Sequence, residues 1–157
     1  MDGREQQRKE IETIRERTIT VNLSDADCHR LMLKCGESGL TVGKLIENFV
    51  GDLIDGTYSN GSDERDLVCQ WFERCSFGLF QAQTLLSHLI WQGYAPESYL
   101  NALDNEECEE LNDMMEDWSP QKEPDMGQEV AKIREWVKEK EALIDGCAKE
   151  VSDEQNL

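Results

Sequence analysis

The chain has 157 residues, of which 38% are hydrophobic and 32% charged, so it can form one compact domain or two small ones around a modest core. It contains no run of 18 apolar residues, which excludes a membrane-spanning helix, and its polar first ten residues do not resemble a secretory signal. A cytoplasmic protein is therefore expected.

The formal net charge of −18 is unevenly distributed along the chain. Residues 1–56 contain eight Lys/Arg and eleven Asp/Glu side chains, a charge of −3, whereas residues 57–157 contain eight and 23, a charge of −15. The acidic remainder should repel nucleic acid, and it can attract basic protein surfaces.

The first third of the chain predicts an arm, a strand and two helices. Residues 1–16 carry mixed charges with little apolar pattern and are expected to form a flexible or helical arm. Residues 18–23 alternate polar and apolar side chains, as a strand does. Ser24 and Thr41 are suitable N-caps for two amphipathic helices that follow the strand, and Gly56 ends the second.

The turn-rich stretch 56–66 predicts a domain boundary. Residues 57–118 are expected to form an acidic helical domain, with helices over residues 67–75, 85–90 and 97–118. Residues 119–125 contain two of the three prolines and predict a linker. Residues 126–157 predict a C-terminal amphipathic helix, whose nearly heptad apolar spacing is interrupted by Lys140.

The sequence contains no pattern typical of a catalytic or metal site. The six cysteines form no C-x-x-C pair, and most are expected to be buried reduced thiols on apolar helix faces. No Ser/His/Asp set and no phosphate loop is present. We therefore expect a protein that is not an enzyme and has no cofactor and no metal.

Eight carboxylates lie between residues 104 and 117, and no basic residue lies among them. Such a run is usually a solvated helix face, and metal binding or acid–base chemistry is the less favoured interpretation. If the run binds a partner, the expected acidic partner surface consists of Glu106, Glu109, Glu110 and Asp113.

The order of strand, turn, helix, glycine-containing turn and helix over Arg17–Ile54 resembles the ribbon-helix-helix family of Arc-, MetJ- and CopG-type DNA-binding proteins. "TITVNLS" is similar to the family's strand, and "SGLTVGKLIENFVGDLI" to its turn and second helix. The step of seventeen residues from Ser24 to Thr41 also matches the family. The resemblance implies a mainly α fold with a ribbon-helix-helix module over residues 17–56, followed by the acidic helical region.

In this family two protomers each give one strand to an antiparallel ribbon that lies in the DNA major groove. The resemblance thus implies a homodimer on a double-stranded DNA operator, with an apolar strand face formed by Ile19, Val21 and Leu23. The residues implied to read bases are Thr18, Thr20 and Asn22. Those implied to bind phosphate are Arg17, Thr41, Val42 and Lys44. The alternative is a module that only dimerises.

The function expected from the sequence is a DNA-binding regulator, either repressor-like or an accessory protein of a mobile genetic element. In that case residues 57–157 could bind a basic protein partner. The alternative is an acidic inhibitor of the anti-CRISPR or anti-restriction type, whose carboxylates imitate DNA in the basic groove of a nucleic-acid enzyme. The ribbon-helix-helix module would then serve dimerisation.

Overall fold

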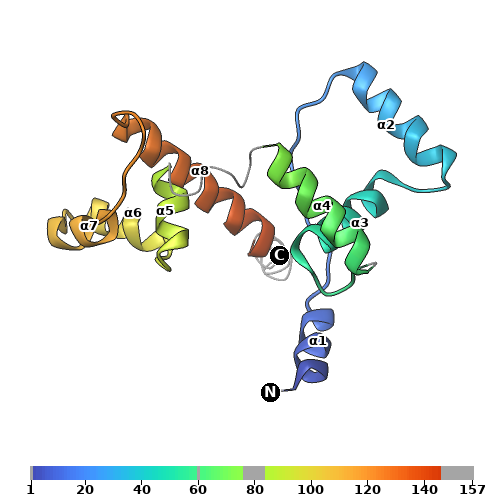
Figure 1. Cartoon of the computed structure of the whole chain (residues 1–157), viewed down its shortest axis with the longest axis horizontal. Helices are drawn as coiled ribbons and strands as arrows, with labels where there is room; N and C mark the ends of the chain where they lie inside the picture. The colour runs from blue at the N-terminus through green and yellow to red at the C-terminus, as the bar shows by residue number, and fades with distance from the viewer. Residues whose placement is uncertain (1, 60, 76–83, 146–157) are drawn as a thin grey trace, which may run out of the picture. The chain divides into compact units, whose positions relative to one another are not determined.

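A computed structural model of the chain describes residues 2–59, 61–75 and 84–145. These residues contain eight α-helices and no β-strand (Figure 1). The chain divides into two compact units, Met1–Phe77 (unit 1) and Gly78–Leu157 (unit 2), which are described separately below. No helix in the described ranges combines the length and the apolar character that crossing a membrane requires.

Unit 1 contains four helices: α1 (Gly3–Glu12), α2 (Asp25–Glu37), α3 (Val42–Ile54) and α4 (Ser62–Arg74). The predicted caps of α2 and α3 are confirmed. The Ser24 hydroxyl accepts a hydrogen bond from the backbone N–H of Asp27 at 3.1 Å, and the Thr41 hydroxyl accepts one from Lys44, also at 3.1 Å. The predicted arm forms helix α1, and the Asp2 carboxylate caps it by accepting a hydrogen bond from the backbone N–H of Glu5.

The predicted strand is wrong, and with it the ribbon-helix-helix fold. Residues 14–24 form no regular secondary structure, and no described residue pairs with them as a neighbouring strand. Alternating side chains give a segment the propensity for a strand, but only a second strand can bond its backbone N–H and C=O groups. Polar and apolar side chains of residues 18–23 are alike exposed, so the alternation separates no buried face.

The best-packed part of unit 1 is the pair of helices α3 and α4. The Phe49 and Trp71 rings meet edge to face, with centroids 5.4 Å apart. Helix α3 ends at Asp55, which adopts the left-handed conformation and forms an ion pair with Arg65 of α4. Helix α2 is joined to its neighbours by irregular segments on both sides (Figure 1), contacts α3, and buries only Cys35.

Unit 2 contains four helices around a hydrophobic core: α5 (Leu85–Trp91), α6 (Pro96–Asp104), α7 (Cys108–Met115) and α8 (Met126–Ile144). The fully buried side chains of the core include Leu85, Leu89, Tyr99 and Ile133. Helix α8 packs onto this core through its apolar positions, which explains the spacing seen in the sequence. The last predicted helical residues, 146–157, lie outside the described ranges.

The helix predicted over residues 97–118 is in fact two helices, α6 and α7. Glu106 adopts a positive φ of 56°, a left-handed conformation that interrupts the helix. The backbone N–H of Glu107 donates to the Ala102 carbonyl at 2.9 Å, which closes the end of α6. The turn contains no glycine, and the apolar periodicity of the sequence continues across it, so the sequence predicts one helix where the structure has two.

The expectation of mostly buried cysteines is also wrong. Cys35 is buried, Cys28, Cys69, Cys75 and Cys108 are exposed, and Cys147 lies outside the described ranges. The exposed thiols of α2 and α4 follow from the open packing of unit 1, whose helices are not covered on their outer sides by any described part of the unit.

Candidate interaction surfaces

Unit 1 exposes many of its large apolar side chains. Only Cys35, Gly51 and Asp52 are buried among its described residues. Nine aliphatic or methionine side chains of the segment 14–24, α2 and α3 each expose 40% or more of their area, and we call them the unit 1 apolar surface: Ile14, Ile19, Val21, Leu23, Met32, Leu33, Ile46, Val50 and Ile54. Apolar exposure of this extent in one folded unit favours a surface that a partner covers.

A groove lies on one side of this surface. It has a volume of about 330 Å³ and is lined by Ile14, Val50, Ile54 and Tyr58 together with polar residues of α3. The Gly51 backbone forms part of its floor, where the loop after α3 folds back onto the helix. The groove is thus an apolar depression within unit 1, of a size that suits a few side chains.

The predicted base-reading residues lie on the irregular segment between α1 and α2. Thr18, Thr20 and Asn22 are exposed, and within the described residues their side chains make no hydrogen bond. Their hydroxyl and amide groups are available for a ligand. The structure does not present them as one face of a ribbon.

Three of the four predicted phosphate-binding residues come together at the start of α3. Thr41 caps the helix, Val42 is its first residue, and Lys44 lies in its first turn. The Lys44 ammonium is 3.2 Å from the Glu47 carboxylate on the exposed side of the helix. Arg17 lies instead on the segment before α2, where its guanidinium donates to the Thr13 carbonyl at 3.1 Å. The helix N-terminus is suited to an anion, and a phosphate there would compete with Glu47 for Lys44.

The predicted acidic partner surface extends over the turn before α7 and over α7 itself. Glu106 lies in the turn, Glu109 and Glu110 in the first turn of the helix, and Asp113 one turn later. All four are exposed, and none forms an ion pair with another described residue. No group of three or more potential ligands in the described part of the chain is close enough to hold a metal ion.

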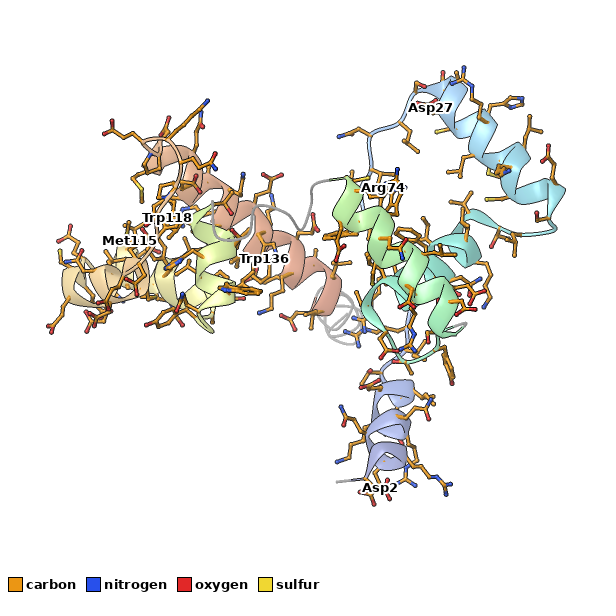
Figure 2. The ribbon with its side chains drawn as sticks, viewed as in Figure 1. Asp2, Asp27, Arg74, Met115, Trp118 and Trp136 are labelled. Atoms are coloured by element: carbon orange, nitrogen blue, oxygen red, sulfur yellow. The ribbon has the colours of Figure 1, made fainter. Side chains whose placement is uncertain are left out.

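Lys140, which interrupts the apolar spacing of the last helix, has a structural role that the sequence did not reveal. Its ammonium lies 2.7 Å from the Glu97 carboxylate of α6 and 5.4 Å from the centre of the Trp136 ring (Figure 2 labels Trp136). The hydrogen bond from Lys140 lowers the pKa of Glu97 below its usual value. Only the break in the heptad pattern could have pointed to this link between α6 and α8.

Comparisons of the chain with protein-family models, with curated proteins and with solved structures gave no match. No relative therefore supports the resemblance of Arg17–Ile54 to the ribbon-helix-helix family, and the fold that this resemblance implied is not the one observed. The candidate sites rest on the geometry of this chain alone.

Proposed function

We propose that this protein is a self-associating regulator, without enzymatic activity, that binds double-stranded DNA through unit 1. The observation that carries the proposal is the unit 1 apolar surface. A folded unit that leaves these side chains in water gives up the main driving force for its own folding, so a second copy that covers them would stabilise it.

The size of the surface supports this role. Full burial of an aliphatic side chain is worth about 1.5–3 kcal/mol at about 25 cal/mol per Å², which corresponds to roughly 60–120 Å² per side chain. Nine side chains about half exposed then present roughly 300–500 Å² of apolar area per copy. A standard interface buries about 800 Å² per partner, of which a little over half is apolar. The exposed apolar area of unit 1 therefore agrees with the apolar area of one side of a standard interface.

DNA is the ligand that we propose for the assembled units. Residues 1–56 are almost neutral, with eight basic side chains against eleven acidic ones, whereas the rest of the chain is strongly acidic. The start of α3 offers backbone N–H groups and Lys44 to a phosphate. Thr20 and Asn22 offer hydroxyl and amide groups that can form hydrogen bonds with base edges. The irregular segment that carries these two residues can become ordered when it binds DNA. This role belongs in the cytoplasm.

Self-association is tested by sedimentation of the full chain and of Val21→Asp, with Thr20→Asp as the control at a neighbouring exposed position. Val21→Asp should shift the protein toward the monomer because it places a charge on the unit 1 apolar surface, and Thr20→Asp should not. A wild-type chain that stays monomeric at 100 times the working concentration would refute the association.

DNA binding is tested by selection from a random double-stranded library, followed by fluorescence anisotropy. Lys44→Ala should weaken binding to all sequences alike and should lower the salt dependence. Asn22→Ala should reduce the preference for the selected site. Lys122→Ala, in unit 2, serves as the charge-matched control and should leave binding unchanged. The DNA role fails if the selection yields no enriched sequence and Lys44→Ala binds DNA as the wild type does.

The acidic surface supports a second candidate function, inhibition of a nucleic-acid enzyme through its basic groove. The supporting observation is that Glu106, Glu109, Glu110 and Asp113 are exposed without ion pairs within the described residues. Neutralising all four with Gln or Asn should leave operator binding unchanged, or tighten it, if the protein acts on DNA. Loss of cellular activity with operator binding retained would favour the inhibitor.

A further inference from the structure

The segment between α1 and α2 carries backbone groups and apolar side chains that the described part of its own chain does not cover. Residues 18–23 form no backbone hydrogen bond with any other described residue. In an extended conformation their side chains alternate, so Ile19, Val21 and Leu23 lie on one side. Val21 exposes 67% and Leu23 50% of its area. The segment, which Figure 1 shows as a trace between α1 and α2, therefore occupies no apolar site in the described residues of its own copy.

The groove beside α3 offers what such a segment lacks. Its apolar part is formed by Ile14, Val50, Ile54 and Tyr58, and Ile54 exposes 66% of its area. Asn48 also lines the groove and is exposed, and its amide forms no hydrogen bond with another described residue. A side-chain amide can donate to a peptide carbonyl and accept from a peptide N–H. The groove, with a volume of about 330 Å³, thus suits two aliphatic side chains of a segment whose backbone passes Asn48.

We propose that this groove binds the segment 18–23 of a second copy, with Val21 and Leu23 inserted beside Val50 and Ile54. The inference rests on the proposed self-association and names the contact through which it occurs. Both halves of the contact are present in every copy, so a two-fold dimer forms it twice, with the segment of each copy in the groove of the other. The contact joins a segment to a helix, and no strand of one copy pairs with a strand of the other.

A second copy is the occupant that the apolar area of unit 1 favours. The exposed area agrees with one side of a standard interface when the segment and α3 both contribute to it, as they do in this arrangement. An unrelated partner that filled the groove alone would leave Val21 and Leu23 in water, whereas a second copy buries the segment and the groove at once. Thr20 and Asn22 alternate with the buried side chains, so they point away from the groove and stay available to DNA.

The test mixes two variants of the full chain, each with one half of the contact damaged. Val21→Asp has a damaged segment and an intact groove, whereas Ile54→Asp has a damaged groove and an intact segment. Alone, each should dimerise at least about tenfold more weakly than the wild type, because both contacts of its dimer place a carboxylate among apolar side chains. In the mixture, the groove of the first variant can bind the segment of the second. The mixed dimer keeps one undamaged contact and should form at least about threefold more tightly than either variant alone.

Sedimentation velocity, with one variant of each mixture carrying a fluorescent label, measures the mixed dimer. The control mixture is Val21→Asp with Leu23→Asp, in which both segments are damaged, and it should show no recovery. Circular dichroism checks that the variants keep their helix content, which is expected because all three positions are exposed. Val50→Asp replaces Ile54→Asp as the groove variant if the latter loses helix content.

The proposal is overturned if the groove variant dimerises as the wild type does, or if its mixture with Val21→Asp recovers no more association than the control mixture. A segment that folded into the groove of its own chain would give the first of these results. In either case, a wild type that dimerises and is weakened by Val21→Asp leaves the proposed self-association standing through a different contact. A wild type that stays monomeric refutes the self-association itself, so the two failures can be distinguished.

Discussion

Replacing Gly51 by alanine should destabilise unit 1, although alanine is the better helix former. Gly51 lies in α3 and is buried, and a Cβ atom added there would overlap the carbonyl oxygen of Tyr58. That oxygen belongs to the backbone of the loop that folds back onto α3, so no side-chain rotation relieves the clash. The loop is also held by the backbone hydrogen bond from Gly56 N–H to the Gly51 carbonyl, 2.9 Å long.

Two opposing terms decide the sign of this effect. Overpacking against a fixed backbone costs about 1–3 kcal/mol, whereas glycine to alanine in a helix interior gains up to about 1 kcal/mol. Because the backbone cannot rotate away from the clash, its cost should lie in the upper part of that range, about 2–3 kcal/mol, and the net loss in the free energy of unfolding should be about 1–2 kcal/mol. Gly43 is the matched control, since it lies in the same helix and a Cβ there meets no atom within 4 Å. Gly43→Ala should leave unit 1 unchanged or up to about 1 kcal/mol more stable.

The free energy of unfolding of both variants is measured by urea unfolding followed by circular dichroism. Trp71 fluorescence reports on unit 1 alone when the other three tryptophans, all in unit 2, are replaced by phenylalanine. Equal stability of Gly51→Ala and Gly43→Ala would show that the loop does not lie against α3 as described. The reasoning about the groove beside Gly51 would then be wrong as well, because the same loop supplies one of its walls.

Four further outcomes are expected. The pKa of Glu97 is lowered in the folded protein, so its stabilising contribution is present above the unfolded pKa and is lost as the pH falls from about 4.5 through the folded value. Glu97→Gln should remove this acid-dependent part of the unfolding free energy, at most about 1 kcal/mol because the pair with Lys140 is partly exposed. His88→Leu should destabilise unit 2 by about 1–3 kcal/mol in urea unfolding, because the buried ring nitrogen Nε2 lies 3.1 Å from the Met114 carbonyl and must donate to it. Glu106→Gly should keep or raise the melting temperature, since glycine adopts the positive φ of 56° without strain; a clear fall would contradict this. The melting temperature of unit 1 should rise with protein concentration and that of unit 2 should not, which calorimetry at two concentrations can check.

The sequence predicted the beginnings of helices better than their interruptions. Ser24 and Thr41 were identified as caps because a hydroxyl before an amphipathic pattern satisfies free backbone N–H groups, a purely local effect. The break between α6 and α7 is not visible in the sequence because a non-glycine residue, Glu106, adopts the left-handed conformation there. Lys140 was seen only as an interruption, since its partner Glu97 lies 43 residues away.

The strand failed for a different physical reason, which also bears on function. Apolar periodicity indicates that a face is to be buried, but it does not indicate which chain will cover it. In unit 2 the pattern and the packing agree, because four helices of one chain bury Leu85, Leu89 and Ile133 completely. In unit 1 the same kind of pattern leaves Val21 67% exposed. The described residues of unit 1 thus leave apolar side chains exposed, and the proposed self-association depends on these side chains, so association is the first property to measure.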